Sequence, residues 1–161
     1  GGLKETMGES MAVFAPNANS YRRFKAGAYA PVNRACGSNN RTVSLRIPHC
    51  DEKSARVEHL PAGADANPYL VMACMLAGLH HGIANRIDPG PMEKADAYHR
   101  PTTELPLRWE KALEVFEEGR VLKSYLGEHY HEVYAANRRF ECDNFHEVIS
   151  ALDYEWYMRT V

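Results

Sequence analysis

Apolar residues recur at helical spacing at the start of the chain. Four of them follow one another at intervals of three or four positions: Leu3, Met7, Met11 and Phe14. This spacing places them on one side of a helix, which Pro16 and the asparagines after it must end. The pattern therefore predicts an amphipathic helix over about residues 3–14.

Further along, the apolar positions alternate with polar ones, as in a strand with one buried face. The apolar members of the alternation are Val43, Leu45 and Ile47, and the polar ones are Thr42, Ser44 and Arg46. Turn residues at Gly37–Asn40 separate this strand from one expected around Val32–Cys36, so the pair reads as a hairpin. A third strand is expected around Ala55–Leu60.

The second half of the chain is predicted to be helical. Tyr69–Arg86 is apolar nearly all round, which is typical of a helix buried on most sides, and we expect it to be the core helix. A shorter helix around Trp109–Phe116 and a longer one through Leu122–Val133 follow. Helical structure is expected to continue to the C-terminus with a break near Asp143–Asn144. Strands early and helices late predict an α+β fold, with residues 1–64 holding a helix and strands and residues 65–161 mainly helical.

Composition narrows the class of protein. The chain has 161 residues, with 19 Lys+Arg against 21 Asp+Glu and a formal net charge of −2. This near balance argues against a chain-wide surface for nucleic acid or anionic membrane. The longest apolar stretch, Tyr69–Leu79, is too short to span a bilayer. Four scattered cysteines favour reduced thiols in a cytoplasmic protein.

Cations are concentrated in the strand-rich region. They are Arg22, Arg23, Arg34, Arg41, Arg46, Lys53 and Arg56. Arginines that converge on one face would bind a polyanion such as a nucleoside triphosphate, and a solvated face with surface ion pairs is the alternative. Arg56 and Glu58 are two residues apart and so lie on one face of a strand. Glu58 is then either a salt-bridge partner or a metal ligand, and one carboxylate alone does not hold Mg²⁺.

Other side chains suggest sites less clearly. His80, His81, His129 and His131 suggest zinc, but no cysteine or second histidine lies with them at ligand spacing on a common strand or turn. Satisfied or exposed imidazoles on helix faces are the simpler interpretation. The aromatic residues of the last helices favour a core or a subunit interface over a surface that stacks bases.

Five segments resemble, in order and spacing, the C-terminal half of the catalytic domain of the glutamine synthetase family. They are Asn17–Arg23, Ala30–Pro31, Asn40–Pro48, Arg56–His59 and Asp65–Leu70. The helical remainder resembles the closing segment of that family with weaker motifs. The resemblance implies an α+β fold in which a few antiparallel barrel strands precede helices. It also implies that the N-terminal β-grasp domain and the first part of the catalytic domain lie outside this sequence, which begins with Gly1.

In this family, ATP phosphorylates the side-chain carboxylate of glutamate, and ammonia or an amine then displaces the phosphate. The resemblance implies ATP and Mg²⁺ or Mn²⁺ as cofactors, glutamate and an amine as substrates, and a ring-shaped homo-oligomer. By position in the motifs, Arg41 and Arg46 would contact the ATP phosphates and stabilise charge on the transferred phosphoryl group. Lys53 and Arg56 would lie near the nucleotide, and Glu58 would be a metal ligand.

On the substrate side the chain departs from the family pattern. Arg23 would hold the glutamate carboxylate. Tyr29 stands where ammonia-using synthetases usually carry a Glu, just before Ala30–Pro31, and Leu60 stands where the family normally places an Arg. Loss of the carboxylate that receives the ammonium proton resembles the branch that glutamylates putrescine and other polyamines.

The sequence therefore predicts an ATP-dependent carbon–nitrogen ligase of the γ-glutamylpolyamine type. This chain would be an incomplete part of that enzyme and inactive by itself. An ammonia-using glutamine synthetase and a non-catalytic truncated module are the alternatives. Leu60 favours the non-catalytic module, whereas the retained Arg41, Arg46, Arg56 and Glu58 oppose it.

Overall fold

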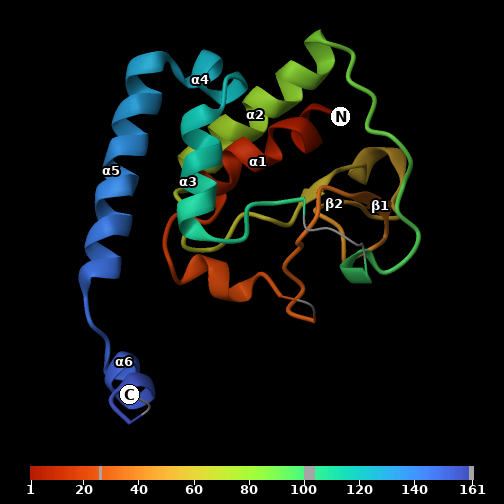
Figure 1. The fold of residues 1–161 in the computed structure, drawn as a ribbon. Coiled ribbons are helices and arrows are strands. Elements are labelled where there is room, and N and C mark those ends of the chain that lie inside the picture. The colour runs from red at the N-terminus through yellow and green to blue at the C-terminus, as the bar shows by residue number, and fades with distance from the viewer. Residues whose placement is uncertain (26, 100–103, 160–161) are drawn as a thin grey trace.

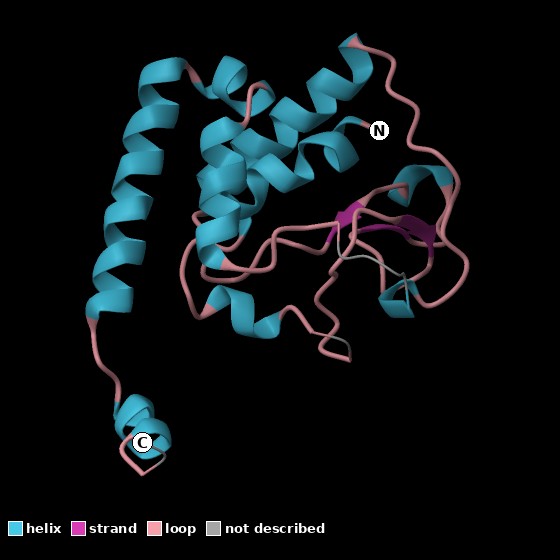
Figure 2. Cartoon of the chain, viewed as in Figure 1, coloured by secondary structure: helices cyan, strands magenta, loops and turns pink. Residues whose placement is uncertain are grey.

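The computed structural model describes residues 1–25, 27–99 and 104–159. Helices occupy one side of the molecule and a small sheet with long loops occupies the other (Figure 1), and the strands are short beside the helices (Figure 2). In chain order the described elements, with η for 3₁₀ helices, are α1 (Gly2–Phe14), η1 (Ser20–Arg23), β1 (Cys36–Ser38), β2 (Leu45–Ile47), η2 (Glu52–Ser54), β3 (Glu58–His59), α2 (Pro68–Ala84), η3 (Ala97–His99), α3 (Trp109–Glu118), α4 (Val121–Leu126), α5 (Glu128–Glu147) and α6 (Ala151–Tyr157). The predicted α+β class, with strands early and helices late, is confirmed. Among the described helices, none is both long and apolar enough for a membrane crossing.

The central helix of the molecule is α1. It packs against both α2 and α3, and Met7, Met11 and Phe14 are almost inaccessible to solvent. Thr6 and Ser10 are buried too, and each hydroxyl donates to the backbone carbonyl four residues earlier. Because these polar side chains are small and satisfied within the helix, α1 can be buried on more sides than its apolar stripe predicts.

Most of the apolar surface of α2 is exposed, contrary to the predicted core helix. Asn67 caps the start of this helix, since its side chain accepts hydrogen bonds from the backbone N–H groups of Tyr69 and Leu70. The buried residues are Cys74, Ala77 and Gly78, whereas Tyr69, Met72, Leu76, Leu79 and Ile83 are exposed. The prediction of burial all round was wrong because one side of the helix, with the small residues at its centre, faces the described rest of this chain.

Glycines decide which side of α2 is buried. A Cβ atom added to Gly2 would lie 2.1 Å from the carbonyl oxygen of Gly78, and one added to Gly78 would lie 2.6 Å from Thr6 Oγ1. Both separations are too short for real side chains. Only a glycine contact therefore permits α1 and α2 to approach so closely.

After α3 the chain bends at positions that differ from the predicted ones. The expected helix through Leu122–Val133 is interrupted at Gly127, which adopts a φ of 85° that glycine tolerates without steric cost. Helix α5 then runs without interruption through Asp143–Asn144, where a break was expected. The break falls between α5 and α6, where Ser150 and Asp153 form a capping box that begins the new helix.

The described strands form a sheet in the order β1–β2–β3. β1 and β2 are parallel and β2 and β3 are antiparallel, so the predicted hairpin between the first two strands was wrong. Asn40 Oδ1 accepts hydrogen bonds from the N–H and hydroxyl of Thr42, and Ser44 donates to the carbonyl of Asn33. The contact between Ser44 and Asn33 places the residue before β2 beside a residue that precedes β1. The two strands therefore run in the same direction from neighbouring starting points.

Candidate functional site

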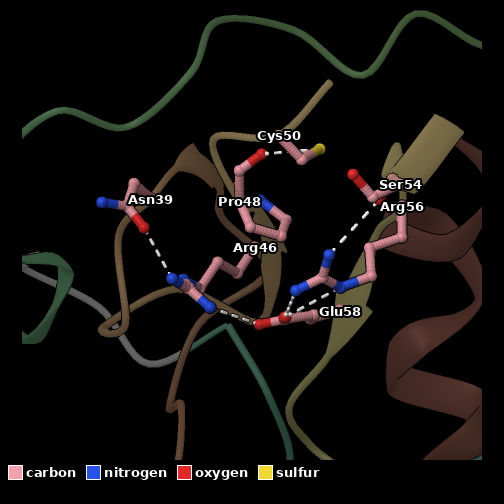
Figure 3. Close-up of polar contacts among 7 residues, drawn as sticks. All are labelled: Asn39, Arg46, Pro48, Cys50, Ser54, Arg56 and Glu58. Carbon is pink, nitrogen blue, oxygen red and sulfur yellow. Dashed lines mark hydrogen bonds and ion pairs between the residues drawn. The ribbon is translucent and has the colours of Figure 1, made fainter. Parts of the chain in front are cut away.

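The pairing of β2 with β3 brings Arg46 and Glu58 together. The two residues are direct register partners, so their side chains leave the sheet on the same face. Arg46 Nη1 lies 2.5 Å from Glu58 Oε2 (Figure 3), and the side chains are 15% and 29% exposed. The result is a charge-assisted, partly buried ion pair.

Arg56 adds a second guanidinium to Glu58. Its Nη2 and Nε atoms lie 3.0 Å and 3.2 Å from Glu58 Oε1, so the carboxylate sits between two arginines (Figure 3). The hydrogen bond from Arg46 lowers the pKa of Glu58 and those from Arg56 lower it further, while partial burial acts in the opposite direction. The carboxylate is therefore ionised at neutral pH. Within the described residues, the salt-bridge interpretation of Glu58 accounts for its contacts.

Asn39 holds the other side of the Arg46 guanidinium. Arg46 Nη2 donates to Asn39 Oδ1 at 2.5 Å, and Asn39 adopts a φ of 48°, which asparagine tolerates better than most residues. Asn40 fastens the same turn by donating to the carbonyl of Ala95 at 2.9 Å. Both asparagines belong to the turn predicted at Gly37–Asn40. Asparagine tolerates the left-handed backbone conformation, which suits Asn39 to this turn. That preference does not predict the hydrogen bond between Asn39 and Arg46.

A cavity of about 240 Å³ opens at this face of the sheet. It is lined by Tyr29, Arg41, Arg46, Glu58 and Leu60. Tyr29 is 72% exposed and adopts a φ of 52°. An aromatic residue with positive φ is strained by roughly 1–3 kcal/mol, and such residues concentrate at ligand sites. The cavity thus combines two cations, one carboxylate and an exposed aromatic ring.

Two residues predicted for the site lie apart from this cavity. Arg23 donates a hydrogen bond to the carbonyl of Pro61, and its guanidinium lies 4.4 Å from the centre of the Phe24 ring. Lys53 is exposed in η2. Neither residue lines the cavity, so the fold of this chain does not bring them together with Arg46.

His59 points away from Glu58 and toward the core. Its ring meets that of Phe14 edge to face, with 4.5 Å between centroids. Burial lowers the pKa of His59 to about 4, and the charge of Arg23 adds to the effect, so the imidazole is neutral at pH 7. The alternation of β3 therefore separates a charged face from an apolar one.

The side chains of the cavity fit a phosphate group. Arginine guanidiniums present paired N–H donors that match phosphate oxygens, and Arg41 and Arg46 line the cavity with Arg56 beside it. A Mg²⁺ ion takes about six oxygen ligands. Among the described lining residues, Glu58 alone offers a carboxylate, and two arginines already hold it. The described residues that line this cavity therefore do not hold a divalent cation by themselves.

The histidines considered for zinc have other partners. His131 is buried and donates from Nε2 to a backbone carbonyl 2.8 Å away. His80 Nδ1 lies 2.7 Å from the Tyr125 hydroxyl, and His81 Nε2 lies 3.1 Å from Glu5 Oε1. For these three residues, the interpretation as imidazoles with ordinary hydrogen-bond partners is confirmed.

Comparison with known proteins defines the class. Residues 1–157 match the family model of the glutamine synthetase catalytic domain. The chain is 42% identical over 158 residues to γ-glutamylputrescine synthetase PuuA of Escherichia coli (strain K12), covering 98% of this chain and 34% of that relative. It is 35% identical over 156 residues to γ-glutamylethanolamide synthetase GlnA4 of Streptomyces coelicolor, covering 94% of this chain and 32% of the relative. The solved GmaS/ADP complex superposes with a TM-score of 0.86 at 28% identity, over 98% of this chain and 38% of that structure.

The chain belongs to the glutamine synthetase family. The resemblance to this family, which rests on segments such as Asn40–Pro48 and Arg56–His59, is confirmed. The similarity to PuuA agrees with the polyamine branch of the family that Tyr29 indicated. The chain spans about a third of the length of the curated relatives it matches. The activity, substrates and assembly of the whole protein are therefore matters for proposal.

Proposed function

We propose that this chain is part of an ATP-dependent ligase that joins an amine to the γ-carboxylate of glutamate through a γ-glutamyl phosphate. The observation that carries the proposal is the cavity in which Arg41, Arg46 and Glu58 meet beside Tyr29. Phosphoryl transfer requires fixed positive charge around the phosphate, and two guanidiniums at one cavity supply it. The 42% identity to a γ-glutamylputrescine synthetase supports the same class of reaction.

The arginines act on the phosphates. Arg41 and Arg46 bind the phosphate groups of ATP and stabilise the negative charge on the phosphoryl group during transfer. Glu58 and Asn39 hold Arg46 on opposite sides of its guanidinium, so its orientation is set before a ligand arrives. Such preorganisation removes the free-energy cost of reorienting the charge at the moment of reaction. Arg56 extends the cationic surface beyond the cavity.

Three further roles rest on the motif match. Lys53 lies near the nucleotide, Arg23 holds the substrate glutamate, and Glu58 supplies one ligand to Mg²⁺ or Mn²⁺. The remaining metal ligands would come from outside this chain, because one carboxylate is not enough. When bound, the metal would neutralise phosphate charge. The charge of Glu58 at neutral pH, which its depressed pKa maintains, is compatible with this role.

Tyr29 determines which nucleophile is preferred. An ammonium ion must lose a proton before attack, and a phenol carries no negative charge at neutral pH with which to attract the ion or accept that proton. An alkyl amine can pack its chain on the exposed ring and place its ammonium group over the aromatic face. The relatives named for putrescine and ethanolamide products are in keeping with an amine substrate.

In the full-length protein we expect kcat/KM for putrescine to exceed that for ammonium by at least about tenfold, which corresponds to about 1.4 kcal/mol of transition-state free energy. Tyr29→Glu should narrow this ratio, and Tyr29→Phe should preserve it because the ring face remains. Tyr154→Glu, on the exposed surface of α6, is the matched control and should leave the ratio unchanged. The rate of ADP release with glutamate and either putrescine or ammonium gives this ratio for the native protein and the three variants. Ammonium used as well as every amine tested would make an ammonia-using glutamine synthetase the better assignment.

The 161-residue chain by itself is expected to have no ligase activity. Phosphoryl transfer in this class relies on metal ions that bridge the phosphates, and the cavity of this chain offers one carboxylate for them. Phosphate release that depends on glutamate, measured on purified chain of verified mass, tests this expectation. Activity above the background of an Arg46→Ala sample would show that the chain is sufficient.

Two other functions are tested by the same assays. Glutamine synthesis from ammonia is supported by the 31% identity to the glutamine synthetase of Methanosarcina mazei over 98% of this chain. A non-catalytic module is favoured by Leu60, an apolar residue in the wall of the cavity. Full-length protein that binds ATP but releases no ADP with any amine would support the non-catalytic module.

We also propose a cytoplasmic location and a homo-oligomeric ring for the full-length protein. The four cysteines are free, which suits a reducing compartment. Met72 and Ile83 expose apolar surface on α2, and in the assembled protein another chain segment or a neighbouring subunit would cover it. No nucleic-acid or membrane partner forms part of the proposal.

A further inference from the structure

Three potential metal ligands meet between α3 and α5, on elements other than those that carry Arg46 and Glu58. Cys142 and His146 are four residues apart on α5 and therefore share one face of that helix. Glu110 lies in the first turn of α3, which packs beside α5 (Figure 1). One ligand atom from each of the three side chains lies within 4.8 Å of the other two.

The imidazole of His146 lies between the other two potential ligands. Cys142 Sγ lies 3.7 Å from His146 Nδ1, and Glu110 Oε1 lies 3.0 Å from His146 Nε2. With Zn–S of about 2.3 Å and Zn–N or Zn–O of about 2.0–2.2 Å, tetrahedral ligands are separated by roughly 3.4–3.6 Å. These two contacts use opposite ring nitrogens, and one ion can take only one of them, so the His146 ring must rotate to bind. Because one ligand atom from each residue already lies within 4.8 Å of the other two, that rearrangement is short.

The surroundings leave room for a fourth ligand. Glu110 and His146 line a hollow of about 260 Å³, and their side chains are 48% and 49% exposed. Cys142, by contrast, is buried. The site thus has an inner thiol and an outer side that water can reach, which suits three protein ligands and one solvent molecule.

Charge balance also favours a divalent cation. A thiolate and a carboxylate neutralise the two charges of the ion, so the guanidiniums of Arg22 and Arg108 at the same hollow face a site with no net charge. Arg139, whose positive charge also acts on Cys142, forms two hydrogen bonds to the carboxylate of Glu117.

The same three residues could be read as a nucleophile, a base and an orienting carboxylate. Burial raises the pKa of the Cys142 thiol, and the negative charge of Glu110 raises it further. A reactive cysteine needs the opposite shift and access to solvent. A metal ion overcomes this obstacle because it displaces the thiol proton on binding.

We propose that Cys142, His146 and Glu110 form a zinc site that joins α5 to α3. The thiol proton passes to solvent, one ring nitrogen of His146 donates its lone pair, and water completes the coordination. Thiolate and imidazole ligands select Zn²⁺ or Co²⁺ over Mg²⁺, which distinguishes this site from the oxygen-ligand chemistry proposed for Glu58.

Cobalt titration of the 161-residue chain tests the proposal. We expect a thiolate-to-cobalt charge-transfer band that saturates at one ion per chain, disappears on addition of Zn²⁺ and does not respond to Mg²⁺. Cys142→Ala should abolish the band. Cys50→Ala, which removes an exposed thiol, is the matched control and should keep it. Absence of the band from the unsubstituted chain, or its loss in Cys50→Ala, would overturn the site, as would a band that survives Cys142→Ala.

Two exposed positions keep the test decisive if Cys142→Ala does not fold. Glu110→Gln and His146→Gln are each expected to weaken cobalt binding by at least about tenfold while circular dichroism stays unchanged. Zinc at a hundredfold excess over its Kd should raise the Tm of the chain by about 5 °C or more, and this rise should be lost in His146→Gln. Unchanged cobalt affinity in both variants would overturn the zinc site, and the contacts among Glu110, Cys142 and His146 would then be hydrogen bonds and ion pairs only.

Discussion

Replacing Arg46 by Ala is expected to lower kcat/KM of the full-length ligase by about 10²–10³. Arg46 lies in the cavity wall and is held by Glu58 on one side and Asn39 on the other, with 2.5 Å to each. Alanine removes a preoriented positive charge from the position proposed for the transferred phosphoryl group. It also leaves Glu58 with Arg56 as its remaining guanidinium contact among the described residues.

The conservative replacement separates charge from geometry. Arg46→Lys keeps the positive charge but cannot bond Glu58 and a phosphate with a planar fork, so activity should fall between those of the native protein and Arg46→Ala. Arg86→Ala, at an exposed position after α2, is the matched control and should stay within about twofold. ADP release under saturating amine gives the comparison. A threefold or smaller loss in Arg46→Ala would remove Arg46 from the proposed mechanism.

Replacing Phe116 by Ala is expected to lower the free energy of unfolding of the chain by about 3–5 kcal/mol. The ring is fully buried on α3, stacks on His131 with 4.2 Å between centroids and contacts Tyr134. Its loss removes apolar burial and leaves a cavity where α3 meets α5. Since a domain of this size is typically stable by about 5–15 kcal/mol, the change is a large part of the total.

Phe140→Ala provides the control for the same chemical change on a surface. Phe140 is on α5 and 69% exposed, so its replacement should change the free energy of unfolding by no more than about 0.5 kcal/mol. Urea unfolding followed by circular dichroism measures both variants. Equal effects of the two substitutions would contradict the position of Phe116 in the core.

Helix positions were largely predictable because local signals decide them. The spacing of Met7, Met11 and Phe14 and the apolar stretch from Tyr69 are signals within the segment itself, and the structure has helices where they indicate. The break at Gly127 was missed because a glycine inside an apolar pattern is often tolerated within a helix. Only the path of the chain into α5 determined that this glycine would take a positive φ.

Burial was less predictable than helix formation. The apolar composition of α2 indicated a core helix, yet small residues on one stripe meet α1 while large ones remain exposed. Helix α1 has a weaker apolar pattern and is the central helix. The apolar composition of a helix such as α2 indicates that its surface is stabilised by contact with other apolar groups. Whether that surface is buried depends on which segments of the protein lie against it.

For the site, strand alternation predicted that Arg56 and Glu58 share a face, and the hydrogen bonds between them confirm it. The register of β2 and β3 adds Arg46 opposite Glu58. The sequence also determined the class of protein, because the order and spacing of its motifs are specific to one family. Tertiary structure alone decided three other matters. It showed that β1 and β2 are parallel, that Asn39 orients Arg46, and that Glu110 meets Cys142 and His146 across two helices. These features join residues through strand pairing, side-chain hydrogen bonds and helix packing between segments distant in the sequence, and such contacts leave no periodic trace along the chain.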